Sequence, residues 1–146
     1  MVRTVYVNGE FISEGDAAIS IFDRGFLFAD SVYEVIAVLG GKLVDWNGHI
    51  ARLKRSLHYL NIEFPFDEKT LVKLHRHIVK LNDLVDGLIY MQVSRGTAER
   101  DFLIQENLKV SLVMFSQELN LLDSDRLNRC LRVITVPEAR WRHRDI

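Results

Sequence analysis

The chain has 146 residues, of which 48% are hydrophobic and 27% are charged, so it is long and apolar enough to bury the core of one domain. Its 19 basic and 20 acidic residues give a formal net charge of −1, which excludes the strong overall field that favours nucleic acid or an anionic membrane surface as a partner. No segment approaches the run of roughly 18 apolar residues in a membrane helix, and residues 1–9 lack the apolar stretch of a signal peptide, so we expect a cytoplasmic protein.

Turn-forming residues predict two β-hairpins near the start of the chain. Asn8-Gly9 tolerates the positive φ angles of a tight turn and separates short apolar runs at residues 4–7 and 11–12. Farther on, an apolar and β-branched run over residues 32–39 reaches two glycines and resumes at residues 42–46. This pattern predicts a second and longer hairpin.

The spacing of apolar residues predicts two helices in the middle of the chain. From Gly48 onward, one helical face collects Ile50, Leu53, Leu57 and Leu60. After Pro65, Asp67 can cap a second helix that ends near Asn82 or Gly87. The buried stripe expected for this second helix consists of Leu71, Leu74, Ile78 and Leu81.

Three further apolar runs predict strands at residues 88–94, 110–115 and 131–136. Strands therefore outnumber helices, and the two helices follow each other along the chain. This order predicts an α+β fold, in which a mostly antiparallel sheet carries helices on one side.

General catalytic motifs are absent from the sequence, which contains no GxGxxG, Walker, GxSxG, HExxH or CxxC pattern. His75 and His77 are two residues apart and would point to different sides of a helix, so we expect both at the solvated surface and predict no metal site. Cys130 is the single cysteine, which excludes an internal disulfide. We expect it to be a buried structural thiol.

A few cationic and phenolic side chains remain as candidates for ligand binding. Arg52 lies near the start of the first predicted helix, where a guanidinium and backbone amides can hold a phosphate, although an ordinary solvated arginine fits the same position. Arg95 and Arg100 follow a predicted strand directly, which is a common place for ligand-binding groups, and surface charge is the simpler interpretation. Tyr33 lies among apolar residues, so a core position and a functional position are equally open.

Five segments form an ordered set along the chain. They are Asp-Arg-Gly-Phe at 23–26, Phe-Ala-Asp-Ser-Val-Tyr-Glu-Val at 28–35, His-Ile-Ala-Arg-Leu at 49–53, Ile-Tyr-Met-Gln-Val-Ser-Arg-Gly at 89–96 and Arg-Trp-Arg-His-Arg-Asp-Ile at 140–146. In order and spacing, they resemble the N-terminal half of fold-type IV pyridoxal-phosphate-dependent aminotransferases, and among these the D-amino-acid transaminases. The resemblance spans nearly the whole chain.

The resemblance implies a domain organisation and a cofactor. Residues 1–120 would form the small N-terminal domain, and residues 121–146 would form the linker and first strand of a larger α/β domain that continues beyond the given sequence. Pyridoxal 5′-phosphate would lie between the two domains, and a homodimer would complete the site. The Schiff-base lysine is expected immediately after Ile146, so the given sequence would contain no catalytic residue.

The resemblance also implies roles for four residues. Arg52 matches the arginine that binds the cofactor phosphate, and Arg100 matches the arginine that pairs with the substrate α-carboxylate. Tyr33 matches the tyrosine whose hydroxyl assists on the same side. Phe102 stands where the D-specific enzymes carry a histidine, so one carboxylate donor is missing and an apolar ring would shape the pocket instead.

The activity implied is amino-group transfer between a D-amino acid and a 2-oxo acid such as 2-oxoglutarate or pyruvate. Branched-chain aminotransferases and aminodeoxychorismate lyase share the fold and the cofactor, so they stay as alternatives. An alternative of another class is a non-catalytic dimerising domain.

Overall fold

The computed structural model describes residues 2–64, 66–122, 130 and 132–138. None of the helices in this part of the chain is both long and apolar enough to cross a membrane. In chain order the elements are β1 (Thr4–Val7), β2 (Glu10–Ser13), α1 (Arg24–Phe28), β3 (Ser31–Leu39), β4 (Lys42–Leu43), α2 (Trp46–Tyr59), α3 (Glu68–Leu81), β5 (Gly87–Ser94) and β6 (Ser111–Glu118).

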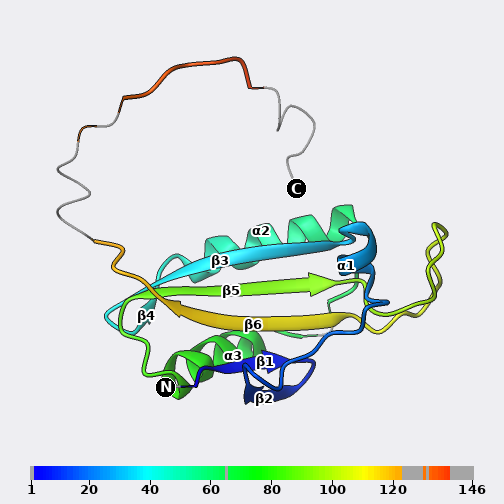
Figure 1. The fold of residues 1–146 in the computed structure, drawn as a ribbon, viewed down its shortest axis with the longest axis horizontal. Coiled ribbons are helices and arrows are strands. Elements are labelled where there is room, and N and C mark those ends of the chain that lie inside the picture. Colours follow the sequence, from blue (N-terminus) through cyan, green and yellow to red (C-terminus); the bar gives the residue numbers. More distant parts are fainter. Residues whose placement is uncertain (1, 65, 123–129, 131, 139–146) are drawn as a thin grey trace.

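The strands form one antiparallel sheet with the order β2-β1-β6-β5-β3-β4. Its centre is the long pairing of β5 with β3 and β6, in which Met91 lies opposite both Glu34 and Met114. Figure 1 shows the sheet as a single layer with α2 and α3 behind it. The predicted fold class, an α+β layer with helices on one side of an antiparallel sheet, is therefore confirmed for the described part of the chain.

Both predicted hairpins form, and the second is shorter than expected. Asn8 and Gly9 take φ angles of 51° and 113° and join β1 to β2. The strand β4 has only two residues, because Asp45 takes the left-handed conformation and α2 begins at Trp46. The strand predicted over residues 42–46 is therefore too long, and the helix starts earlier than its apolar spacing predicts.

One face of the sheet forms the core with α2 and α3. Because side chains alternate between the two faces of a strand, every second residue of the central strands points to the helices. The core residues of the three central strands are Val32, Ile36, Val38, Ile89, Met91, Val93, Leu112 and Met114. The helix residues packed against them are Ile50, Leu53 and Leu57 of α2 and Leu71 and Ile78 of α3. These are the predicted apolar stripes, except that Leu81, at the end of α3, is exposed.

His75 is buried in α3, so the prediction of a solvated side chain is wrong at this position. The residue is 0% exposed, and its Nδ1 donates to the backbone oxygen of Leu71 at 2.8 Å. Burial lowers the pKa of His75 to about 4, which keeps the ring neutral near pH 7. His75 follows Leu71 by one helical turn, so it lies on the apolar stripe. His77 is exposed, as predicted.

Residues 132–138 form no strand, so the strand predicted over residues 131–136 is wrong for the residues described there. Val133 and Ile134 are 81% and 87% exposed, and the described sheet does not include this segment. Without a neighbouring strand, extended backbone has only water for its hydrogen bonds. Cys130, near this segment, is exposed rather than buried. The domain division at residue 120 stays a prediction.

Two buried arginines share the carboxylate of Asp30 at one end of the sheet. Arg24 Nε donates to it at 2.8 Å, and Arg95 donates through Nε and Nη2 at 2.7 and 2.9 Å. Arg95 also donates to the backbone oxygens of Leu60 and Asn61, just beyond α2. This cluster fixes the ends of α1, α2 and β5 relative to one another.

Candidate functional site

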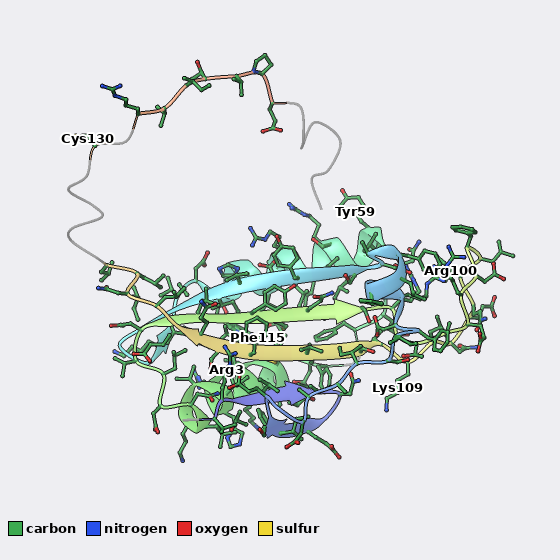
Figure 2. The ribbon with its side chains drawn as sticks, viewed as in Figure 1. Arg3, Tyr59, Arg100, Lys109, Phe115 and Cys130 are labelled. Atoms are coloured by element: carbon green, nitrogen blue, oxygen red, sulfur yellow. The ribbon has the colours of Figure 1, made fainter. Side chains whose placement is uncertain are left out.

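The face of the sheet opposite α2 and α3 carries a row of aromatic rings. Tyr33 of β3 stacks on Tyr90 of β5 with ring centroids 5.4 Å apart, and Tyr90 stacks on Phe115 of β6 at 5.0 Å. The guanidinium carbon of Arg3 lies 5.5 Å from the Phe115 ring centroid, and Figure 2 shows both residues in front of the sheet. Tyr33 is 60% exposed, so it is a surface residue of this open face and not a core tyrosine.

A cavity of about 460 Å³ lies beside these rings on the open face. Tyr90, Phe115 and Phe26 contribute aromatic side chains to its lining, and Gln92 and Asp23 contribute polar ones. The lining of the cavity is therefore mixed, with apolar rings and polar side chains. None of the three candidate arginines, Arg52, Arg95 and Arg100, lines it.

Asp23 is a buried acid in the lining of this cavity. It is 2% exposed and accepts hydrogen bonds from Ser94 Oγ at 2.8 Å, Ser111 Oγ at 2.7 Å and the backbone nitrogen of Gly25 at 2.8 Å. These donors hold the carboxylate rigidly between α1, β5 and β6. Sequence reasoning missed this arrangement, because the serines lie 71 and 88 residues away along the chain.

On the helix-facing side of β3, Glu34 binds two basic side chains of α2. Glu34 is 2% exposed and accepts hydrogen bonds from Arg52 Nε at 2.7 Å and Arg52 Nη2 at 2.6 Å. His49 Nδ1 contacts the same carboxylate at 2.8 Å. Sequence reasoning missed Glu34 and His49 as site residues, although an acid at a buried position of an apolar strand is a signal, because buried carboxylates are normally paired.

The Glu34–Arg52 pair is ionised at neutral pH. Burial raises the pKa of Glu34, but hydrogen bonds from Arg52 and His49 outweigh this effect and hold the pKa below its usual range. The hydrogen bonds and charge of Glu34 raise the pKa of Arg52, and Tyr33 adds a smaller effect in the same direction. The carboxylate and the guanidinium therefore stay charged and bound to each other.

The outer edge of the Arg52 guanidinium is open. The Arg52 side chain is 56% exposed, whereas that of Glu34 is 2% exposed. Both hydrogen bonds of Arg52 within the described chain use Nε and Nη2, which leaves Nη1 free. A planar guanidinium that is fixed on one edge and open on the other is suited to bind a phosphate group. The residues present therefore fit the phosphate of the cofactor expected from the sequence.

Arg100 lies on the loop beyond the end of the sheet, at the right of Figure 2. Its guanidinium carbon is 5.5 Å from the ring centroid of Phe28 and 5.3 Å from that of Phe102, distances typical of cation–π contacts. Arg24 Nη1 donates to the backbone oxygen of Asp101 at 2.8 Å and anchors the loop. Within the described chain the Arg100 guanidinium makes these ring contacts and no hydrogen bond, so its N–H donors are free for a ligand.

The structure brings some of the predicted site residues together and leaves others apart. Arg100 and Phe102 form one group on the loop, whereas Arg52 belongs to the Glu34 cluster. Tyr33 precedes Glu34 on β3 and points to the opposite face of the sheet. In the part of the chain that is described, no contact joins Arg100 to Arg52 or Tyr33, so their convergence on one ligand stays a prediction.

Arg52 and β3, whose Glu34 binds it, both lie within a region shared with a known family. A family model described as amino-transferase class IV matches residues 31–145. The chain belongs to the class IV aminotransferases. The resemblance found in the sequence motifs is thereby confirmed.

Several class IV aminotransferases are similar to this chain over nearly all of its length. A D-alanine aminotransferase from Staphylococcus aureus (strain MSSA476) is 32% identical over 146 residues, covering 99% of this chain and 51% of that protein. A D-alanine aminotransferase from Bacillus licheniformis is 32% identical over 142 residues, covering 97% of this chain and 50% of that protein. The chain spans about half the length of these curated relatives.

Solved structures of other enzymes share the fold. The branched-chain amino acid aminotransferase from Escherichia coli superposes on 82% of this chain and 42% of its own chain, with a TM-score of 0.76 and 16% identity. The 4-amino-4-deoxychorismate lyase from Pseudomonas aeruginosa covers 78% of this chain and 39% of its own, with a TM-score of 0.62 and 24% identity. At these identities the similarity shows the fold alone.

Proposed function

We propose that the full-length protein is a pyridoxal-phosphate-dependent transaminase that moves an amino group between a D-amino acid and a 2-oxo acid such as 2-oxoglutarate or pyruvate. The observation that carries this proposal is the guanidinium of Arg52, held on one edge by the buried Glu34 and open on the other. Family membership and 32% identity to a D-alanine aminotransferase support it.

In this proposal Arg52 binds the phosphate of the cofactor. When bound, pyridoxal phosphate supplies an electron sink for the charge left on the α carbon of an amino acid that loses its proton. Arg52 contributes position and charge neutralisation, because a guanidinium bound to phosphate fixes the far end of the cofactor. The lysine expected immediately after Ile146 would hold the cofactor at its other end and move the α proton.

Three further residues are proposed to define the substrate site. Arg100 pairs with the substrate α-carboxylate, which is supported by its free donors and by the rings that hold its guanidinium in place. The hydroxyl group of Tyr33, a residue that is 60% exposed, donates to the carboxylate on the same side. Phe102 supplies an apolar wall at the position of the missing histidine. Anchoring the carboxylate in this way fixes which substrate enantiomer presents its α hydrogen for removal.

We propose a homodimer as the active form. Within one described chain Arg100 contacts Phe28 and Phe102, while Arg52 contacts Glu34, so a single chain leaves the two ligand-binding arginines in separate groups. A second copy would complete the site by contributing one of these groups. The exposed side chains of Phe102 and Leu103 offer apolar surface for such an interface.

Replacing Arg100 with alanine is expected to raise the KM for D-alanine and to lower kcat/KM by about 10–100-fold, because a hydrogen bond to a charged group contributes about 1.5–3 kcal/mol. Steady-state kinetics on the full-length protein measure the effect. Arg55→Ala is the control, since Arg55 is an exposed arginine of α2 that has no role in the proposed site. Kinetics of Arg100→Ala equal to those of the control would remove Arg100 from this role.

One panel of substrates distinguishes the proposed activity from the other activities found in the same fold. The panel contains D-alanine, the branched-chain L-amino acids and 4-amino-4-deoxychorismate, each supplied at the same concentration to the full-length protein. Preference for D-alanine supports the proposal, whereas preference for either of the other two substrates would replace it with the corresponding activity. A complete lack of turnover would favour the remaining alternative, a non-catalytic dimerising domain.

A further inference from the structure

We infer that Glu34 is a positioning residue for cofactor binding: it acts through Arg52 by fixing the guanidinium with its open edge toward the phosphate. This inference rests on the proposed function, because it presupposes that Arg52 binds phosphate. It goes beyond that function by assigning a role to a buried acid that the proposed function leaves unassigned.

The hydrogen bonds of Glu34 determine the orientation of Arg52. Glu34 Oε1 accepts from Arg52 Nε at 2.7 Å, and Oε2 accepts from Nη2 at 2.6 Å. Two parallel bonds of this kind fix the plane of the guanidinium as well as its position. His49 Nδ1, at 2.8 Å from Oε2, occupies the same carboxylate from a second direction. The carboxylate therefore cannot rotate without breaking several hydrogen bonds.

The burial of the two partners distinguishes this ion pair from others in the described chain. In the Arg3–Glu14 pair both side chains are 39% exposed, so each partner is free to move in solvent. The arginines that bind Asp30 are as buried as Asp30 itself, so they are closed to a ligand. Glu34 is 2% exposed while Arg52 is 56% exposed. An acid fixed in the core thus holds an arginine whose other edge faces outward.

Geometry and charge make opposite predictions for the role of Glu34. The negative charge of Glu34 lowers the net positive charge near Arg52, so by charge alone its removal would strengthen phosphate binding. Fixing the guanidinium reduces the side-chain freedom that is lost when a ligand binds, so by geometry its removal would weaken phosphate binding. The buried, two-point contact favours the geometric effect.

The test compares pyridoxal 5′-phosphate with pyridoxal, which has the same ring but no phosphate. Dissociation constants of both compounds are measured for the cofactor-free full-length protein and for Glu34→Gln, Arg52→Ala and the double variant. We expect Glu34→Gln to weaken binding of pyridoxal phosphate about tenfold and to leave pyridoxal binding unchanged. In the Arg52→Ala background, Glu34→Gln should produce no further change, because residues that act through one another are not additive.

Two additional variants keep the test decisive. Glu34→Asp retains the charge but shortens the side chain, so we expect it to lose the preference for the phosphate-bearing compound as well, even if Glu34→Gln does not fold. Glu14→Gln is the matched control, because it removes the acid of an exposed pair with Arg3 and should leave both dissociation constants unchanged.

One outcome would overturn the inference and leave the proposed role of Arg52 intact. In that outcome Arg52→Ala selectively weakens binding of pyridoxal phosphate, but Glu34→Gln and Glu34→Asp do not change the ratio of the two dissociation constants. A stronger preference for pyridoxal phosphate in Glu34→Gln would show that charge dominates and would also overturn it. Equal weakening of both compounds would show a general structural role instead. If Arg52→Ala leaves the ratio unchanged, the proposed role of Arg52 fails together with the inference.

Discussion

Replacing Asp30 with asparagine is expected to lower the free energy of unfolding by about 3–5 kcal/mol, which is the usual effect of removing one partner of a buried ion pair. Arg24 and Arg95 are 5% and 8% exposed, so both would keep buried charges without a carboxylate. Urea denaturation at neutral pH measures the change. Glu14→Gln is the control, because an exposed pair contributes at most about 1 kcal/mol.

The same variant should change how stability depends on pH. Burial raises the pKa of Asp30, but hydrogen bonds from Arg95 and Arg24 outweigh burial and hold its pKa below the ordinary value of 3.8. A carboxyl group with a lowered folded-state pKa stabilises the fold above its unfolded-state pKa and loses that contribution as the pH falls through its folded-state pKa. As the pH is lowered below about 4, the free energy of unfolding of Asp30→Asn should therefore fall less than that of the unmodified chain. An identical acid dependence would contradict the assigned ion pair.

Replacing Arg52 with alanine is expected to weaken binding of pyridoxal phosphate by at least about 100-fold, because a two-point charged contact with phosphate contributes more than one ordinary hydrogen bond. Titration of the cofactor-free full-length protein, followed by visible absorbance, measures the dissociation constant. The dissociation constant of Arg52→Lys should lie between those of the unmodified protein and Arg52→Ala, since lysine keeps the charge but not the planar donor pair.

Arg55→Ala serves as the control for this experiment, because Arg55 is an exposed arginine on the same helix. Removing Arg52 also leaves Glu34 buried with His49 as its remaining partner, so the variants are compared at a temperature where each is folded. A dissociation constant for Arg52→Ala within about twofold of the control would contradict phosphate binding by Arg52, since it would correspond to less than about 0.5 kcal/mol.

Local sequence patterns were sufficient where neighbouring residues decide the conformation. Asn8-Gly9 determines the first hairpin because both residues accept positive φ. Asp67 begins α3 because its side chain accepts from the backbone nitrogen of Thr70 at 2.7 Å. The apolar stripes of α2 and α3 follow directly from helical periodicity.

Interactions between distant segments account for the errors. His75 was predicted at the surface because its spacing from His77 makes a poor metal pair, yet its position on the stripe with Leu71 and Ile78 places it in the core. The apolar run at residues 131–136 has β propensity, but a strand forms only where another strand accepts its hydrogen bonds. A single sequence shows the β propensity of a segment, but it does not show whether another strand lies beside it.

The candidate site was predictable only in part, because it too depends on contacts between distant segments. Arg52 and Tyr33 were identified because they occupy recognisable motifs, and Tyr33 proved to lie on the open face. Glu34 was present in the same motif, but its pairing with an arginine 18 residues later depends on how α2 packs against β3. That packing gives Arg52 its fixed orientation, and composition alone does not reveal it.

Transfer of the amino group of D-alanine to 2-oxoglutarate tests the proposed function most directly. The full-length protein is incubated with pyridoxal phosphate, D-alanine and 2-oxoglutarate, and the glutamate formed is separated by chiral chromatography while pyruvate is quantified. We expect D-glutamate and pyruvate in equal amounts. Formation of L-glutamate, or glutamate no higher than in a mixture without D-alanine, would contradict a D-amino-acid transaminase.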